Sequence, residues 1–161
     1  MSSDTTRVTA EHFRRACGRF ATGITIATVL DATGKPHGLT VNSFTSVSLE
    51  PPLVLICLGH RVAAMAHFRD AAHFGINVLA WDQQELSDTF ARKGHDRFHG
   101  LEWRQGKTGV PLLPGVMAAF ECAAYSRIPM GDHDIFVGEA VAVEVHEKPP
   151  LVYFASSYRS L

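Results

Sequence analysis

The chain has 161 residues, 46% of them hydrophobic, which is enough for one domain with a buried core and too few for two domains of ordinary size. Its 15 basic and 16 acidic residues give a formal net charge of −1, so there is no electrostatic basis for binding nucleic acid or an anionic membrane. We therefore expect a single domain over residues 1–161, whose partners are small molecules or other proteins.

The N-terminus and the cysteines indicate a reducing compartment. The first residues lack the basic and then apolar pattern of a signal peptide, and no apolar run approaches the ~20 residues that cross a bilayer. Cys17, Cys57 and Cys122 are far apart and odd in number, which indicates neither a disulfide framework nor a cysteine metal site. We expect a cytoplasmic protein.

Residues 9–36 predict a helix followed by a β-hairpin. Thr9 is expected to cap the helix. Apolar side chains follow at helical spacing and predict a stripe that packs on the core: Phe13, Cys17 and Phe20. Residues 24–30 are rich in β-branched side chains and predict a strand, while residues 31–36 have the composition of a turn into an antiparallel partner.

The segment 38–48, Gly-Leu-Thr-Val-Asn-Ser-Phe-Thr-Ser-Val-Ser, carries hydroxyl and amide side chains between two apolar runs. The second run, residues 53–58, follows a Pro-Pro pair and predicts a fully buried strand. Polar side chains and backbone donors on such a loop can bind ring heteroatoms, ribityl hydroxyls and phosphate oxygens without a basic residue. The alternative, which composition leaves open, is the polar outer face of an edge strand.

The middle of the chain predicts two helices on either side of one strand. A short helix is expected at residues 63–68, a strand at 74–80 and a second helix at 82–91. Asp82 is expected to cap the second helix, because Glu85 follows three residues later.

The C-terminal part predicts an excursion and then extended strands. Residues 93–114 are rich in Gly, His and charge, and we expect them to cover a site, with one short strand at 101–103. Residues 117–128 and 135–146 predict strands that pair across the turn between them, and 151–154 a last strand. Counting by period two places on one face Val137, Glu139, Val141, Val143 and Val145.

Around six strands with few, short helices favour a mainly β fold, a closed or partly closed antiparallel barrel, over a parallel doubly wound sheet. Neither G-x-G-x-x-G nor a P-loop occurs in the sequence, so a Rossmann or Walker site is not expected. Any flavin or nicotinamide must therefore be held in another way.

Histidines and serines give few signs of catalytic chemistry. His133 lies in a turn, where it is either solvated or a hydrogen-bonding or stacking residue at a pocket mouth. His95 and His99 are spaced like metal ligands but lack H-E-x-x-H, and convergent spacing is also absent for His60, His67 and His73, so we expect no metal site. Neither Ser43 nor Ser46 lies in a G-x-S-x-G elbow, so we expect no nucleophilic serine.

Short motifs follow one another in order through residues 12–161. They lie at residues 20–26, 38–48, 51–54, 74–79 with Gln83, 131–133, 136–139 and 150–154. In order and spacing they resemble the flavin reductase-like family of flavin-binding split barrels. Within that family they are similar to the small NAD(P)H:flavin reductase components of two-component aromatic monooxygenases, such as that of 4-hydroxyphenylacetate 3-monooxygenase.

The resemblance implies a homodimer of split barrels of Greek-key type that binds FMN or FAD and reduces it with NADH or NADPH, for a flavin-dependent monooxygenase partner. It implies flavin contacts at Thr40, Val41, Asn42, Ser43 and Ser46, and nicotinamide contacts at His133, Tyr153 and Phe154. A serine often helps to hold the flavin phosphate in this family, but Val62 stands near that place, so we expect Arg61 to make the contact. Hydride transfer is the cofactors' own reaction, so no catalytic side chain is required.

Two other functions remain open on the sequence. One is a flavoprotein that reduces another acceptor, such as a corrinoid or an iron complex. The other is a flavin-binding module without turnover. His133 together with Tyr153 favours an enzyme over the module, because a storage protein needs no nicotinamide pocket.

Overall fold

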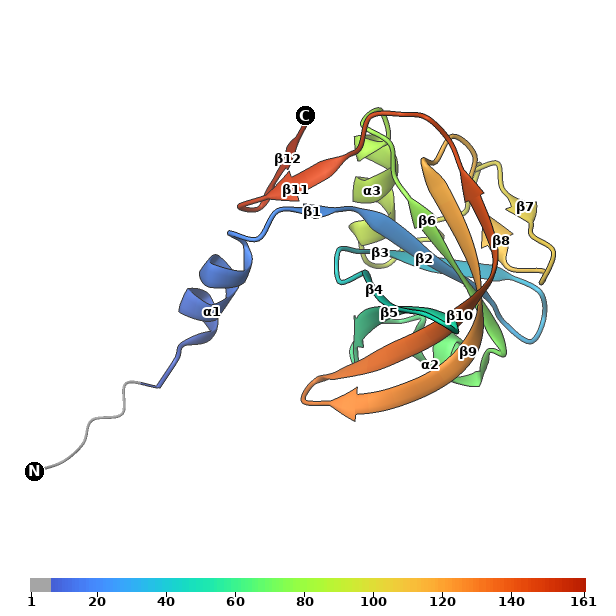
Figure 1. The fold of residues 1–161 in the computed structure, drawn as a ribbon, viewed down its shortest axis with the longest axis horizontal. Coiled ribbons are helices and arrows are strands. Elements are labelled where there is room, and N and C mark those ends of the chain that lie inside the picture. Colours follow the sequence, from blue (N-terminus) through green and yellow to red (C-terminus); the bar gives the residue numbers. More distant parts are fainter. Residues whose placement is uncertain (1–6) are drawn as a thin grey trace, which may run out of the picture.

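A computed structural model describes residues 7–161, which form a mainly β fold with three short helices (Figure 1). The helices are α1 (Ala10–Cys17), α2 (Met65–Asp70) and α3 (Gln84–Ala91). The large sheet contains β2 (Thr25–Leu30), β3 (Pro36–Val41), β4 (Thr45–Leu49), β5 (Pro52–Gly59), β6 (His73–Val78), β9 (Ala118–Met130) and β10 (His133–Val145). Its strand order is β3-β2-β6-β9-β10-β5-β4, antiparallel throughout, which confirms the predicted fold class. The helices predicted at 63–68 and 82–91 correspond to α2 and α3.

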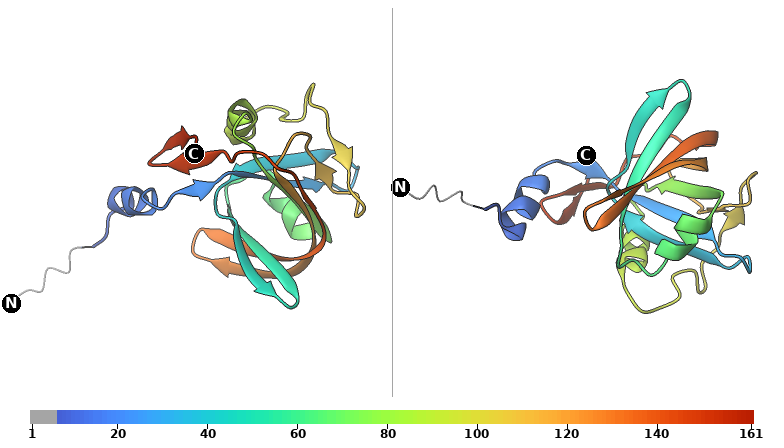
Figure 2. Two further views of the ribbon diagram at one scale, coloured as in Figure 1. Left: turned by 45° about the horizontal axis from the view of Figure 1, so that its top comes forward. Right: turned by 90° about the horizontal axis from the view of Figure 1, so that it is seen from below.

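The two edge strands of the large sheet are consecutive in the sequence, and the sheet curls between them. β3 lies at one edge and β4 at the other, and only residues 42–44 connect them. Figure 2 shows the resulting curvature, which gives a partly closed barrel. The interpretation of residues 38–48 as a loop was therefore wrong for most of its length, because both of its ends are strands.

Two groups of buried apolar side chains hold the helices against the sheet. Ile56, Phe74 and Phe136 belong to the first group, which includes side chains of α2. Phe90 of α3 and Phe98 of the following excursion belong to the second, where their rings meet edge to face at 5.1 Å. The excursion after α3 is thus fastened to the barrel by buried aromatic contacts.

Helix α1 begins where the sequence predicts but does not pack on the core. Thr9 caps it, with its hydroxyl oxygen accepting a hydrogen bond from the His12 N–H at 3.2 Å. No residue of α1 is buried. Phe13 is 62% exposed, and Phe20, just beyond the helix, is 78% exposed. The predicted packing of this stripe on the core was wrong, since the helix stands away from the barrel (Figure 1).

Two small sheets complete the described chain. β1 (Thr22–Gly23), β11 (Val152–Phe154) and β12 (Ser157–Arg159) form a three-stranded sheet between α1 and the barrel (Figure 1). β7 (Arg104–Gln105) and β8 (Pro111–Leu112) form a hairpin within the excursion. The strand predicted at 151–154 corresponds to β11, but it is not the last, because β12 follows it. The strand predicted at 101–103 was wrong, because pairing begins only at Arg104.

Two other predictions fail in their details. β5 is not fully buried: Val54, Ile56 and Leu58 are buried, but the residues between them are half-buried. α3 has Gln83 at its N-cap, so Asp82 does not cap it. The Gln83 carboxamide instead accepts from the N–H of residue 80 and donates to the carbonyl of residue 114, which ties the start of α3 to the chain after β8.

The shared face predicted for residues 137–145 of β10 is also wrong. Two register shifts interrupt its pairing with β9: the first leaves Tyr125 of β9 without a partner, and the second leaves Val141 of β10 without one. The extra residue at Val141 moves the side chains that follow it in β10 to the other face of the sheet. Val137, before this bulge, is buried, whereas Val141, Val143 and Val145 are half or more exposed.

Candidate functional site

A cavity of about 270 Å³ opens where the end of β3, the end of β5 and the β9–β10 turn come together. The segment 40–43 lines one side of it and His133 another, and Gly59 and Val62 contribute from the chain after β5. The structure thus brings five of the predicted contact residues to one cavity: Thr40, Val41, Asn42, Ser43 and His133.

Two hydroxyl groups of this segment are used by the fold. The Thr40 hydroxyl donates to the backbone carbonyl of Ser87 at 2.6 Å, which joins β3 to α3. The Ser43 hydroxyl donates to the Cys57 carbonyl at 3.0 Å and accepts from the Cys57 N–H at 2.9 Å, so it replaces a backbone partner for β5. These side chains fix the backbone of residues 40–43 in place, and the exposed Asn42 side chain is the group presented to a ligand.

Ser46 does not lie in this cavity. It is exposed on β4, opposite Val54 of β5, and belongs to the edge strand that leads away from the cavity. The resemblance groups it with Asn42, but β4 starts three residues after Asn42 and carries Ser46 away from the cavity within one chain.

His133 is held at the rim by its neighbours. Its Nδ1 lies 2.7 Å from the Asp132 carboxylate, and this hydrogen bond lowers the pKa of Asp132. Gly131, with φ of 63°, makes the tight turn before it. The imidazole lies over Gly59, where an added Cβ would meet Nε2 at 3.5 Å. The ring is thereby oriented across the mouth of the cavity.

A buried carboxylate fastens the turn from below. Asp134 accepts hydrogen bonds from Arg69 Nε and Arg127 Nη1, each at 2.9 Å, and lies 2.9 Å from His60 Nε2. The Arg69 hydrogen bond, followed by those from Arg127 and His60, holds the pKa of Asp134 well below its usual range. The His60 N–H also donates to the Asp132 carbonyl, so this cluster joins the chain after β5 to the β9–β10 turn.

A second cavity, of about 390 Å³, adjoins the first and shares Thr40, Gly59 and Val62 with it. Three cationic side chains line it: Arg61, Lys93 and Arg97. Arg61 is the residue expected from the resemblance, whereas the other two come from the excursion. Their charge was visible in the sequence, but their approach to β3 was not, because it depends on how the excursion folds back.

Arg97 anchors that excursion. Its Nη1 donates to the carbonyl of Gly38 at 2.6 Å, and its Nε and Nη2 donate to the carbonyl of Arg92 at 3.0 and 2.7 Å. Burial lowers the pKa of Arg97, although the group remains a cation at neutral pH. The guanidinium therefore acts as a structural clamp and as a positive charge beside the second cavity.

Tyr153 and Phe154 lie apart from both cavities. Tyr153 meets Tyr158 edge to face at 5.4 Å, and the Arg19 guanidinium lies 6.0 Å from the centre of the Phe154 ring. Both belong to the small sheet beside α1. Within residues 7–161 of one chain, these aromatics are not brought to His133.

Within residues 7–161, no helix is long and apolar enough to cross a bilayer.

The three cysteines are free thiols. Cys57 lines the first cavity, and burial raises the pKa of its thiol. A raised pKa keeps this thiol protonated at neutral pH and thus a weak nucleophile.

Comparison with known proteins gives one consistent result. The sequence model described as "Flavin reductase like domain" matches residues 17–161. A probable flavin reductase of Rhizobium meliloti (strain 1021) is 47% identical over 142 residues, which are 85% of this chain and 46% of the relative. The chain thus spans about half the length of that relative.

Other relatives match over most of their length. An NADH-dependent flavin reductase of Rhodococcus sp is 40% identical over 96% of this chain and 88% of its own. The reductase subunit HsaB of a flavin-dependent monooxygenase from Rhodococcus jostii (strain RHA1) is 35% identical over 92% and 76%. The solved structure of the Streptomyces globisporus C-1027 NADH:FAD oxidoreductase SgcE6 with NAD and FAD fragments superposes with a TM-score of 0.88 at 36% identity, over 92% of this chain and 90% of that one.

Proposed function

This chain belongs to the flavin reductase-like family, and on that premise we propose that it is an NADH-dependent flavin reductase that supplies reduced FMN or FAD to a partner monooxygenase. Flavin and nicotinamide supply the redox chemistry themselves, as a hydride passes from the reduced nicotinamide to the oxidised flavin. The protein has to bind both rings in contact and exclude water.

The observation that carries the proposal is the pair of adjoining cavities. The first has a polar, backbone-rich wall at residues 40–43, and the second has Arg61, Lys93 and Arg97. An isoalloxazine needs hydrogen-bond donors and acceptors along its polar edge, and a flavin phosphate needs cations near it. The two cavities meet these requirements in the order in which a flavin nucleotide presents them.

Each group of residues then has a task. The backbone of Thr40 to Ser43 and the Asn42 amide hold the isoalloxazine, and donors among them stabilise negative charge that develops on it during reduction. Arg61, assisted by Lys93 and Arg97, binds the phosphate in place of a serine. His133 lies at the open side and contacts the nicotinamide. Ser46 is left without a contact within one subunit.

We assign Tyr153 and Phe154 to the nicotinamide site of a second subunit. Their distance from His133 in one chain suits this assignment, because the small sheet that carries them extends away from the barrel beside α1 (Figure 1). The enzyme is then a homodimer in which each subunit contributes aromatic rings to the other's site.

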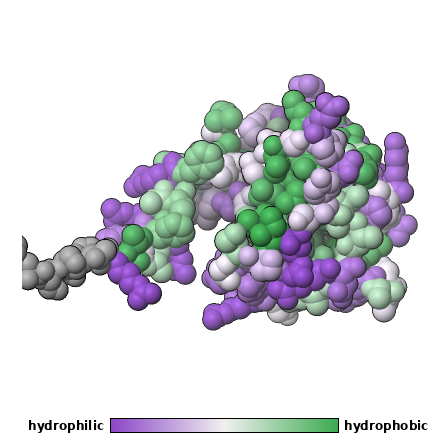
Figure 3. All heavy atoms as spheres, turned by 60° about the horizontal axis from the view of Figure 1, so that its bottom comes forward, coloured by the Kyte–Doolittle hydropathy of each residue, from purple (hydrophilic) through white to green (hydrophobic). Residues whose placement is uncertain are grey.

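The exposed apolar surface supports the homodimer. Helix α1 has eight residues and no buried side chain, and an isolated helix of this length is not stable in water. In Figure 3 apolar side chains gather on the barrel face in view and separately on α1. Exposed valines of β10 and apolar residues of β4 offer a surface for a second copy: Val141, Val143, Val145, Val47 and Leu49.

A reductase of another acceptor has the same cavities but a different product. Anaerobic stopped-flow mixing of the protein, flavin and NADH tests the proposal, because loss of flavin absorbance reports the reaction directly. Turnover with free flavin supports the proposal. A single reduction of bound flavin without turnover of free flavin would favour the other acceptor, and binding without reduction would favour a flavin-binding module.

A further inference from the structure

A third cavity, of about 460 Å³, adjoins the second, and two imidazole groups that line it lie beside a carboxylate. His37 of β3 and His67 of α2 line it, and Asp31, at the end of β2, touches His37. All three side chains are half-buried. The proposed reduction of flavin uses none of them.

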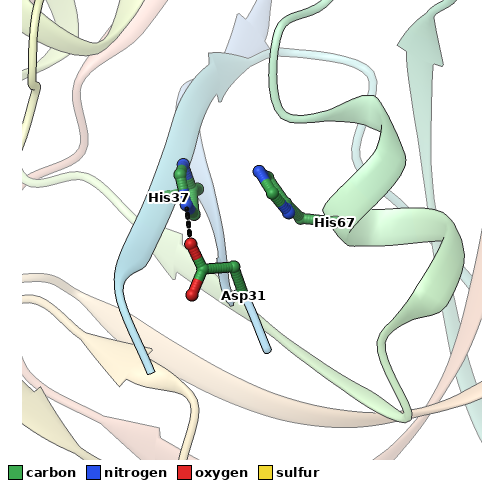
Figure 4. Close-up of side chains that lie close together, drawn as sticks. All are labelled: Asp31, His37 and His67. Carbon is green, nitrogen blue, oxygen red and sulfur yellow. Dashed lines mark hydrogen bonds and ion pairs between the residues drawn. The ribbon is translucent and has the colours of Figure 1, made fainter. Parts of the chain in front are cut away.

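The possible ligand atoms of these three side chains lie close together. His37 Nε2 lies 2.8 Å from Asp31 Oδ2, and the His37 and His67 rings stack with their centres 4.0 Å apart and 23° between their planes. Figure 4 shows the Asp31 carboxylate at one edge of the stacked pair. One nitrogen of each histidine and one carboxylate oxygen all lie within 4.8 Å of one another.

We propose that Asp31, His37 and His67 bind a divalent transition metal ion, with Zn²⁺ as the best match. Imidazole nitrogen and carboxylate oxygen are ligands of Zn²⁺, and three protein ligands leave a fourth position for water. Zinc bonds of about 2.0–2.2 Å place tetrahedral ligand atoms about 3.3 Å apart. His37 Nε2 and Asp31 Oδ2, 2.8 Å apart, have to separate slightly to admit the ion, and a rotation of the His67 side chain brings the third ligand in.

The Asp31 carboxylate is prepared for this role. Its Oδ1 accepts hydrogen bonds from the N–H groups of Thr33 and Lys35 at 2.8 and 3.0 Å and so is fixed by the β2–β3 turn. Its Oδ2 is thereby directed at His37, where a metal ion would replace the shared proton. Hydrogen bonds that orient a ligating carboxylate are the usual support of a metal site.

Nearby cations are engaged elsewhere. Lys35 pairs with Asp96 at 3.5 Å, and the Arg97 guanidinium donates to backbone carbonyls. Neither needs to leave for a dication to enter. The third cavity shares Ala63, Gly94 and Arg97 with the second, but the three proposed ligands do not line the second cavity, so none of them is assigned to flavin.

The test is metal binding by tag-free protein that has been stripped with chelator. Zn²⁺ uptake is measured by equilibrium dialysis, and the visible absorption of Co²⁺ in the same site reports its coordination. We expect one ion per chain. His67→Phe keeps a ring against His37 and removes a ligand, and it should weaken Zn²⁺ binding at least about 100-fold, as should Asp31→Asn, which keeps the acceptor for the turn.

His146→Ala is the matched control, because this histidine is exposed at the far end of β10. It should bind Zn²⁺ like the unmodified protein. Failure of the unmodified protein to bind Zn²⁺ stoichiometrically at sub-millimolar metal would overturn the proposal. So would undiminished binding by a folded His67→Phe variant, with folding checked by circular dichroism. Flavin reduction is assayed separately, so loss of the metal site and loss of the proposed reductase activity are distinguishable.

Discussion

Asn42 lines the first cavity from the short connection between β3 and β4, and its side chain is exposed. We expect Asn42→Ala to weaken flavin binding roughly two- to tenfold, since one hydrogen bond is worth about 0.5–1.5 kcal/mol net. Ser46→Ala, four residues on but outside the cavity, serves as the matched control and should bind flavin normally. Fluorescence-quenching titration with FMN and FAD measures both, and equal affinity of the two variants would contradict the assignment of Asn42.

A substitution at His133 tests the nicotinamide site separately from the flavin site. If it contacts the nicotinamide while residues 40–43 hold the flavin, His133→Ala should lower kcat/KM for NADH about 10- to 100-fold, or about 1.4–2.7 kcal/mol, and leave flavin affinity nearly unchanged. Steady-state kinetics with NADH varied, beside a flavin titration of the same variant, provides the measurement. Equal damage to both ligands would show that His133 has a structural role.

Asp134 links stability to pH. Its pKa is lowered in the folded state, so its contribution to stability is fully present above the unfolded value of about 3.9 and is lost as pH falls from there toward the folded value. Asp134→Asn should therefore lower Tm most at neutral pH, and the difference in Tm from the unmodified protein should shrink below about pH 4. Thermal melts at several pH values check this, and a difference that stays constant with pH would exclude the mechanism.

At the scale of secondary-structure elements, the spacing of hydrophobic residues and the composition of the turns were sufficient to predict most strands of the sheet. The strands at 24–30, 74–80 and 151–154 and the pairing of the two long strands are all present in the structure. Local sequence could not reveal the two register shifts between β9 and β10, because each depends on how these strands pair. It also could not show that β3 and β4 lie at opposite edges, since that follows from curvature of the whole sheet.

Only part of the candidate site could be predicted from the sequence. Residues 40–43 and His133 share a cavity because two segments far apart in sequence meet at the ends of β3 and β10. The resemblance supplied these positions, whereas composition alone left the polar segment open between a loop and an edge strand. The sequence did not predict that Lys93 and Arg97 line the second cavity, because the segment that carries them has no regular pattern to indicate where it folds back.

At the scale of the whole molecule, the exposed apolar surface of α1 is accounted for by a dimer and not by a single chain. Phe13 is 62% exposed on a helix without any buried residue. We expect Phe13→Glu to shift the protein toward monomer in sedimentation velocity, because it places a charge in the proposed interface. Lys107→Glu in the β7–β8 turn, distant from α1 in Figure 1, should leave the dimer intact. A fully active monomer of the unmodified chain would contradict the homodimer.

The proposed function requires hydride transfer between two ligands held by adjoining cavities. Anaerobic stopped-flow spectroscopy tests this most directly, with a catalytic amount of protein, an excess of free FMN or FAD and NADH. We predict multiple-turnover loss of the oxidised flavin absorbance, much faster than without protein, and slowed by His133→Ala. Flavin absorbance that stays at the protein-free rate, with either flavin and with NADH or NADPH, would contradict it.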